Sequence, residues 1–209
     1  MVEVSKSSSP GCLRIRAEGG PNSLIRKLWN YHASYLGEAG DNGQVPSWFR
    51  MDEEVGKGDL ISEASFTEGV ALSCHRLVSE EKPWKVTRLP GVCDLFAAML
   101  AIRSQPLHDG DRLLLTIFPD QNPYLVDLRV EGREILRIGE RKIPSVRFRI
   151  GIQTVATTGS EIGRLAPHKK FRTGRVWITD DARRLPLKAE VDVFIGSVFA
   201  ELAKVSPSL

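Results

Sequence analysis

The sequence is poor in cysteine and has no long apolar run. Three cysteines in 209 residues are too few for a disulfide framework and are typical of a reducing compartment. In an oxidising compartment, a disulfide between Cys74 and Cys93 is an alternative. No apolar stretch reaches the roughly 18 residues that a membrane helix needs, so a transmembrane segment is excluded.

The start of the chain also lacks an apolar stretch. Residues 1–10 read MVEVSKSSSP, without the apolar centre of a signal peptide. Cys12 follows Gly11 as in a lipoprotein, but Ser8 and Ser9 occupy positions where apolar residues are required. The sequence predicts a disordered N-terminus over residues 1–10, and the chain as given reads as cytoplasmic.

Spacings that would indicate a metal or cofactor site are missing. His32, His75, His108 and His168 are scattered, and no Cys-x-x-Cys pair occurs, whereas a metal needs ligands at close and regular spacing. No phosphate-binding or dinucleotide-binding glycine motif is present. We therefore expect no metal and no cofactor.

The composition is that of an ordinary globular protein. Hydrophobic residues make up 42% and charged residues 26%, and area scaling predicts that about 70% of the surface is buried on folding. No internal repeat or low-complexity linker interrupts the chain. We assign residues 11–205 to a single β-rich domain.

Alternation of apolar and polar residues dominates the sequence. Arg184–Ile195 is the clearest case, and Tyr124–Val130 and Val146–Ile152 behave similarly, as expected of strands with one buried face. Short joints rich in Gly, Asn, Asp and Pro favour antiparallel neighbours. After Gly196 the apolar positions shift by one residue, which predicts a β-bulge and a curved strand.

One segment has helical spacing instead. Val92, Leu95, Phe96, Met99 and Leu100 form a stripe, which predicts a helix at about residues 93–104. Asp94 is placed to cap its start. Residues 24–36 fit either a helix or a strand. The predicted fold is α+β and mostly antiparallel, a curved open β-barrel-like sheet with one central helix.

Basic residues are concentrated in one part of the chain. Residues 129–188 contain 15 Lys or Arg against 6 Asp or Glu. Strand alternation gathers some of them on shared faces, and the candidate ligand-binding residues are Arg147, Arg149, Lys170, Arg172, Arg175 and Trp177. Such a patch suits lipid phosphate or an acidic glycan. Nucleic acid is the least favoured partner, because interleaved aromatics are missing. The alternative is a solvated outer face.

The pair Asp180 and Asp181 is the only candidate catalytic set. Adjacent carboxylates can raise one another's pKa and support acid–base hydrolysis. The alternative, which we favour, is a turn between two strands, with Arg183 and Arg184 neutralising the acids.

Several of these segments resemble a known family. The stretch from Cys93 to Ser104, followed by Gly110-Asp111, Gly132-Arg133-Glu134 and the closing run from Val176 to Pro186, is similar to the bacterial family of unknown function numbered 3108. The signature positions that carry the resemblance are Asp94, Arg103, Gly110, Asp111, Glu134, Asp181, Pro186 and Gly196.

The resemblance implies an exported protein of the periplasm or cell envelope. It implies an open, barrel-like sheet near a helix, similar in shape to periplasmic lipoprotein carriers, and makes residues 24–36 strands. Relative to that family the chain lacks a signal peptide and the strands before Leu13, so we expect an N-terminally truncated start.

These observations together predict a non-catalytic envelope protein that binds or scaffolds. Its partner would be an amphiphilic or anionic ligand, lipid or glycan, or another envelope protein. The alternatives are a hydrolase using Asp180 and Asp181 and an interaction module with an exposed edge strand.

Overall fold

The structure is a computed structural model that describes residues 2–19, 31–40, 45–55, 58–67, 70–77, 80–81, 85–89, 91–118, 122–169, 171–193 and 196–201. The backbone divides into two compact units. Unit 1 comprises Met1–Ile102, Thr116–Pro123 and Val155–Arg164, and unit 2 comprises Arg103–Leu115, Tyr124–Thr154 and Leu165–Leu209. Each is described by itself.

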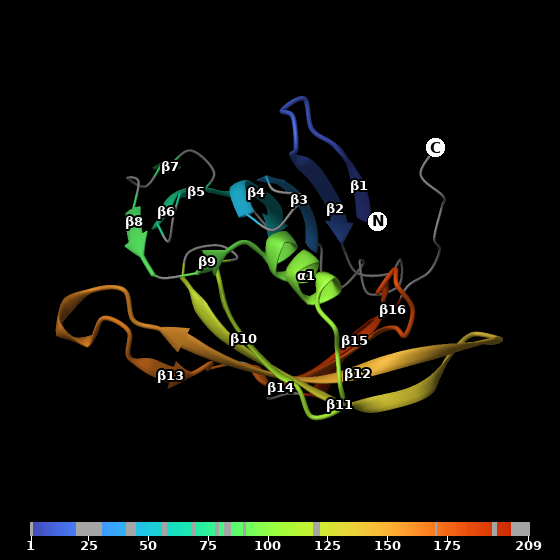
Figure 1. The fold of residues 1–209 in the computed structure, drawn as a ribbon. Helices are drawn as coiled ribbons and strands as arrows, with labels where there is room; N and C mark the ends of the chain where they lie inside the picture. Colours follow the sequence, from blue (N-terminus) through green and yellow to red (C-terminus); the bar gives the residue numbers. More distant parts are fainter. Residues whose placement is uncertain are drawn as a thin grey trace. The chain divides into compact units, whose positions relative to one another are not determined.

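Unit 1 is built on an antiparallel sheet, sheet A (Figure 1). Its neighbouring strands follow one another along the chain, as short joints require. They are β1 (Val2–Lys6), β2 (Leu13–Gly19), β3 (Tyr31–Gly40), β4 (Val45–Val55), β5 (Gly58–Thr67), β6 (Val70–Leu77) and β7 (Glu80–Glu81), with β8 (Lys85–Arg88) also paired to β6.

Two N-terminal segments of unit 1 can be compared with the sequence-based expectations. Residues 2–6, expected to be disordered, form β1, and Val4 pairs with Ile15 of β2. Of the ambiguous residues 24–36, those from Tyr31 onward belong to strand β3, as the family resemblance implied. Residues 24–30 lie outside the described part.

The other sheet, sheet B, runs in the order β16-β15-β14-β12-β11-β10, with β13 beside β12. Its strands are β10 (Arg112–Ile117), β11 (Tyr124–Ile138), β12 (Arg141–Val155), β13 (Leu165–Pro167), β14 (Phe171–Thr179), β15 (Pro186–Val193) and β16 (Gly196–Glu201), and a short 3-10 helix, η3 (Gly159–Glu161), precedes β13. The end of β10 belongs to unit 1, where it pairs in parallel with β9 (Val92–Cys93). The expected α+β class with mostly antiparallel strands is confirmed.

The change of alternation at Gly196 has a different cause from the one predicted. β15 ends at Val193, β16 begins at Gly196, and the two strands pair antiparallel with Val193 opposite Gly196. The expected bulge in one long strand was wrong, because a chain reversal shifts the apolar positions just as an inserted residue does.

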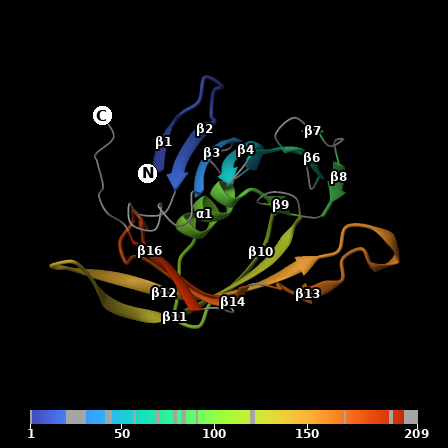
Figure 2. The same ribbon diagram turned by 180° about the vertical axis from the view of Figure 1, so that it is seen from behind.

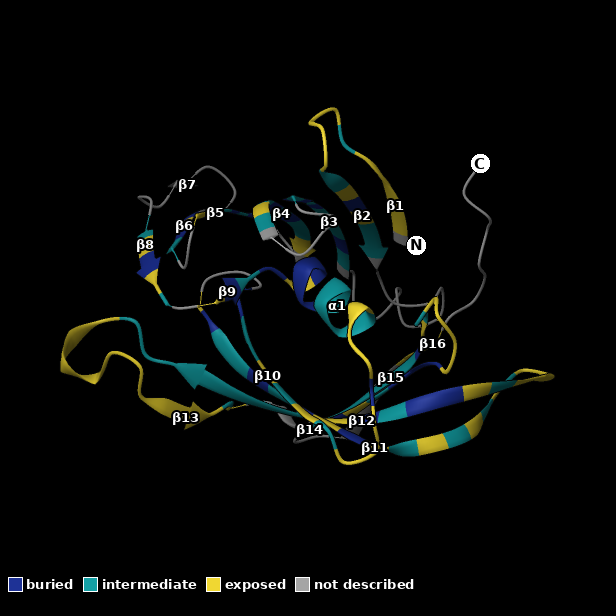
Figure 3. Ribbon diagram, viewed as in Figure 1, coloured by how far each residue is buried: buried dark blue, intermediate teal, exposed yellow. Residues whose placement is uncertain are grey.

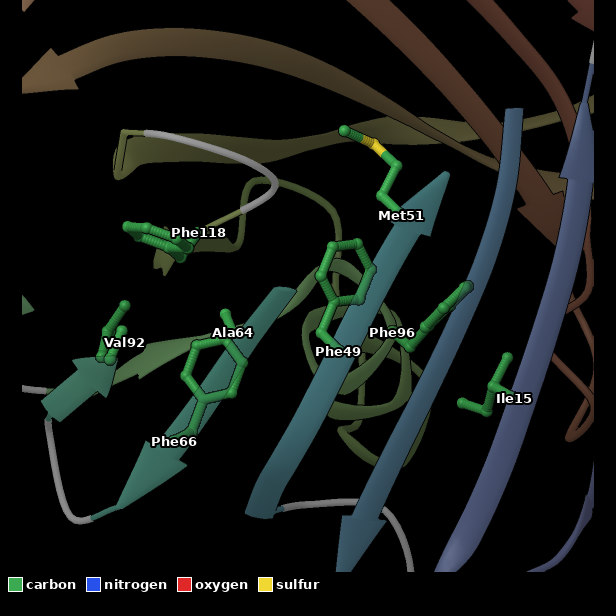
Figure 4. Packing of buried hydrophobic residues seen from close by; sticks show 9 residues of the cluster. Ile15, Phe49, Met51, Ala64, Phe66, Val92, Phe96 and Phe118 are labelled. Atoms are coloured by element: carbon green, nitrogen blue, oxygen red, sulfur yellow. The ribbon is translucent and has the colours of Figure 1, made fainter. Parts of the chain in front are cut away.

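A single α-helix, α1 (Leu95–Ser104), occurs in the described residues, where the apolar stripe predicted it. Figure 3 shows its first turns buried, and Phe96, Ala97 and Ala98 are the buried positions. In unit 1, Phe96 packs with Phe49 of β4, their ring centroids 6.1 Å apart. Figure 4 shows the surrounding cluster, which also contains Ile15, Met51, Ala64, Phe66, Ala71, Val92 and Phe118.

Gly37 of β3 provides the space that this packing needs. A Cβ atom at Gly37 would lie 2.7 Å from Cδ2 of Phe96, closer than carbon atoms approach. The Phe96 ring is 4% exposed and is held by neighbouring side chains, so it has little freedom to move away. The missing side chain of one strand residue therefore lets the helix approach the sheet.

We expect Gly37→Ala to lower the free energy of unfolding by about 1–3 kcal/mol, because overpacking forces a shift of the ring or the backbone. Gly40→Ala is the matched control in the same strand, since its Cβ would meet only Cys12 Sγ at 3.8 Å, an ordinary contact. Urea unfolding of both variants measures the difference. Equal stability of the two would contradict this packing account.

Asp94 caps α1 as the sequence predicted. Its Oδ1 accepts hydrogen bonds from the backbone N–H groups of Phe96 at 2.6 Å and Ala97 at 3.0 Å. The carboxyl group is 1% exposed, and burial raises its pKa to about 6, although the two backbone hydrogen bonds oppose the rise. Protonated Asp94 is therefore favoured in the folded protein relative to the unfolded chain.

The raised pKa has a definite consequence for stability. The Asp94 contribution is fully present below the ordinary pKa of 3.8 and is lost as pH rises through about 6, roughly 3 kcal/mol over that range. Asp94→Asn keeps an acceptor for the cap but does not titrate. We expect the stability of the wild type relative to this variant to fall between pH 4 and pH 6 in urea titrations. A difference that rises over this range would contradict the burial argument.

Candidate functional site

Strand register places three arginines in one row on sheet B. Arg129 of β11 lies directly opposite Arg149 of β12, and Arg149 lies directly opposite Arg175 of β14. Residues opposite each other in an antiparallel pair project from the same face, with Cβ atoms about 5 Å apart. We call these three residues the arginine row.

The arginine row is exposed and only weakly neutralised. All three residues are exposed. Arg175 lies 3.9 Å from Glu131, and among the residues that the structure describes no carboxylate forms an ion pair with Arg129 or Arg149. Their charge acts on Asp127, whose pKa is lowered mainly by its hydrogen bond from Arg112 and further by Arg129 and Arg149. Like charges directly opposite destabilise a sheet, so Arg129 and Arg149 repel each other with no ion pair among the described residues to offset the cost.

Trp177, a candidate ligand-binding residue on the polar face, is buried and contacts charged side chains. It is 6% exposed. Its indole N–H donates to Oε1 of Glu134 at 2.5 Å, and Nζ of Lys188 lies 5.3 Å from the ring centroid, a cation–π distance. Arg147, opposite Trp177 in register, donates to Glu134 Oε2 at 2.9 Å. Arg147 and Trp177 therefore brace the sheet.

A β-bulge separates Trp177 and its charged partners from the arginine row. Register in the β11–β12 pair shifts between Val130 and Gly132, which leaves Glu131 as the extra residue. Gly132 has φ 143°, a conformation that favours glycine. The Glu131 carboxylate reaches Arg147 Nε at 2.9 Å. A bulge redirects side chains locally, and this one supplies a carboxylate to Arg147 while Arg129 and Arg149 receive none among the described residues.

The predicted basic patch is thus only partly assembled. Arg149 and Arg175 come together as predicted, and Arg147 adjoins them but is occupied by two glutamates. Lys170 lies outside the described residues, and Arg172 lies in β14 with its side chain not described. Arg129 was missed, because alternation gave its face but only the register shows which residue it meets.

Asp180 and Asp181 belong to a turn whose carboxylates have separate partners. Asp180 accepts from Arg133 Nε at 3.1 Å and lies 3.7 Å from Arg184 Nη1. Asp181 accepts from Thr179 Oγ1 at 2.6 Å and from the backbone N–H of Arg183 at 3.0 Å. The pKa of Asp181 is lowered to about 2, mainly by the Thr179 hydroxyl and then by Arg183. This is the turn arrangement, and a carboxylate with so low a pKa does not serve as a general acid near neutral pH.

Several segments on which the predicted resemblance rests meet in unit 2. Arg133 joins the loop before β10 to the β14–β15 turn, since it donates to the Leu107 carbonyl at 2.6 Å and pairs with Asp109 and Asp180. The Gly110 N–H donates to the Val130 carbonyl at 2.9 Å beside the bulge. The Asp111 carboxylate accepts from the His108 backbone N–H at 2.7 Å. Motifs far apart in sequence therefore form one structural joint.

The remaining signature positions lie at element ends. Arg103 is in the last turn of α1, where a cation is favourable. Pro186 begins β15 opposite Ile178, and Gly196 begins β16. These positions fix where the chain turns.

A depression lies on sheet A. It has a volume of about 530 Å³ and is lined by residues of β1 to β4, among them Arg14, Arg16, Trp48 and Arg50. Its arginines are paired, Arg14 with Glu38 at 2.5 Å and Arg50 with Asp52 at 2.8 Å. The arginine row, rather than this depression, offers charge to a ligand.

The described residues contain no cluster of three or more His, Cys, Asp or Glu side chains that could hold a metal ion. Cys93 is a free thiol that contacts the Thr116 carbonyl at 3.6 Å, and burial raises its pKa to about 12. No helix in the described part of the chain is long and apolar enough to cross a membrane.

The described structure combines a mostly antiparallel α+β fold with a strand face that carries an in-register row of arginines. The model of the family described as "Protein of unknown function (DUF3108)" matches residues 2–203, and the chain belongs to this family. No curated protein and no solved structure matches the chain. The predicted resemblance to this family is confirmed.

The lowered pKa of Asp181 predicts the pH dependence of Asp181→Asn. The stability that Asp181 contributes is present above its ordinary pKa of 3.8 and is lost as pH falls through about 2. We expect the variant to be less stable than the wild type at neutral pH, with the difference shrinking toward pH 2 in urea unfolding. A difference that grows as the solution is acidified would contradict the turn assignment.

Proposed function

We propose that this protein is a non-catalytic binding protein of the bacterial envelope that holds an anionic ligand on the arginine row. The observation that carries the proposal is the direct cross-strand alignment of Arg129, Arg149 and Arg175. Support for the envelope comes from the family resemblance.

Repulsion within the row favours an anion as its partner. Arg149 faces one arginine on each side, at a cross-strand spacing of about 5 Å. A ligand with two or more phosphate or sulfate groups can bridge neighbouring guanidinium groups, each of which offers paired N–H donors. Binding would then relieve the repulsion and form charge-assisted hydrogen bonds together.

The ligand chemistry shared by the two possible sources is a cluster of oxyanions. A lipid headgroup presents phosphate and an acidic glycan presents sulfate or carboxylate. Trp177 is too buried to offer a stacking face, so the ligand is recognised through charge. The surrounding Asp127 and Glu190 limit the positive region to the row and thereby define its extent.

Calorimetric titration tests the proposal with three probes: inorganic pyrophosphate, a soluble short-chain phosphatidic acid and a heparin tetrasaccharide. We expect saturable binding of at least pyrophosphate. Whichever of the two larger probes binds more tightly identifies the source of the oxyanions as a lipid headgroup or an acidic glycan. Arg149→Gln and Arg175→Gln should each weaken binding roughly ten- to hundredfold, since a hydrogen bond to a charged group is worth about 1.5–3 kcal/mol. Arg164→Gln, which changes an exposed arginine paired with Glu161, is the matched control.

Stability gives the same experiment a second readout. Without anion, Arg149→Gln should melt at a higher temperature than the wild type, because it removes two like-charge pairs of about 0.2–1 kcal/mol each. Pyrophosphate should stabilise the wild type more than the variant. The proposal would be contradicted if none of the three probes bound saturably. It would also be contradicted if the double variant, Arg149→Gln with Arg175→Gln, bound pyrophosphate as tightly as the wild type.

A further inference from the structure

The hairpin of β11 and β12 extends beyond the strands that flank it. The two strands pair from Tyr124–Thr154 to Ile138–Arg141, but β14 pairs with β12 only over Ser145–Ile150. In the described chain, residues 135–143 therefore form strand pairs only with the opposite strand of the hairpin, and Pro144 at the base also accepts a backbone hydrogen bond from Asp180 at 2.9 Å. Figures 1 and 2 show this end of the hairpin projecting from its sheet. We call residues 135–144 the β11–β12 arm.

A two-residue turn closes the arm. Ile138 pairs with Arg141, which leaves Gly139 and Glu140 at the tip, and Gly139 has φ 58°. Glycine with positive φ at the first turn position is the pattern of a type II′ hairpin, whose twist matches that of the strands. The arm is thus a defined two-stranded ribbon.

Apolar side chains occupy both faces of the arm. Ile135 lies opposite Pro144, and on the other face Leu136 lies opposite Ile143. Ile135 is 61% exposed. Isolated two-stranded ribbons are marginally stable in water. A ribbon with apolar groups on both faces is therefore suited to a partly apolar medium that contacts both faces.

Cations also occupy both faces. Arg137 lies directly opposite Lys142, and Arg141 lies on the face of Ile138. Glu140 is the only acid among residues 135–144, and in the described residues the ion pairs of this hairpin stop at Glu134 and Arg147. The like-charge pair of Arg137 and Lys142 resembles the pair of Arg129 and Arg149 in having no ion pair among the described residues.

We infer that the β11–β12 arm binds an anionic lipid surface, with its isoleucines and leucine among the headgroups and acyl boundary and its cations at the phosphates. A protein interface would cover one face of a ribbon, whereas both faces here combine apolar and cationic groups. Long Lys and Arg side chains can bury their apolar stems while their charges reach the phosphates. The inference uses residues other than the arginine row and does not rest on the proposed function.

Vesicle sedimentation of the full chain tests the inference. The vesicles are phosphatidylcholine alone and an equimolar mixture of phosphatidylcholine and phosphatidylglycerol. We expect binding to the mixture only. Arg137→Gln with Lys142→Gln should weaken it about thirtyfold, and Ile135→Ser about tenfold. Hydrogen exchange of the amides of residues 135–144 should slow in the presence of the anionic vesicles.

Matched controls separate the arm from other exposed groups. Ile162→Ser changes an isoleucine that is 63% exposed elsewhere in the chain, and Arg164→Gln removes one exposed cation. Both should bind the anionic vesicles like the wild type.

The inference is overturned if the arm variants bind anionic vesicles like the wild type, or if only the arginine-row variant loses binding. It is also overturned if poly-glutamate protects the arm from hydrogen exchange while the vesicles do not, because the arm would then fit an acidic protein. Loss of vesicle binding confined to the arm variants supports it, whatever the outcome of the pyrophosphate titration.

Discussion

Cross-strand register is the constraint on which the candidate site depends. It brings Arg129, Arg149 and Arg175 from three strands to directly opposed positions on one face. Opposed like charges cost stability, and the chain offers carboxylates close by that could have relieved them. Glu131 and Glu134 instead bind Arg147, and Glu134 also accepts the indole N–H of Trp177. Glu131 approaches the row only at Arg175, at 3.9 Å. Neighbouring charges are paired, whereas repulsion between Arg129 and Arg149 remains. This difference supports the proposal that the row binds an anion.

The bulge at Glu131 makes this division possible. One extra residue in β11 turns the Glu131 carboxylate toward Arg147, and the positive φ of Gly132 permits the distortion. The next residue, Arg133, ties the loop before β10 to the β14–β15 turn. A short Gly-Arg-Glu segment therefore supports both Trp177 with its charged partners and the joint in which several segments of the predicted resemblance meet. Its physical role is to hold sheet B in the register that creates the row.

Local patterns predicted much of the fold, because alternation and helical spacing are set by which face of an element is buried. Asp94 and the apolar stripe after it located α1 correctly, and the strands around Leu128 and Phe148 were predicted. Two errors have one cause. The shift at Gly196 was interpreted as a bulge when it is a hairpin, and Arg129 was left out of the basic patch. Both errors concern which strands pair with each other. Apolar–polar alternation within one strand shows which face is buried, but it does not show the pairing partner. Conversely, Arg147 and Trp177 looked available because acids that neutralise or cap them lie far away in the sequence.

The account predicts that the guanidinium groups of the arginine row respond to an anion as a set. Nuclear magnetic resonance can follow the Nε–H signals of assigned arginines during titration with pyrophosphate. We expect the signals of Arg129, Arg149 and Arg175 to shift with one common dissociation constant, while those of Arg133 and Arg147, held by Asp180 and by Glu131 and Glu134, stay in place. Equal shifts across all exposed arginines, or shifts confined to arginines outside the row, would contradict the claim that the row is a binding site.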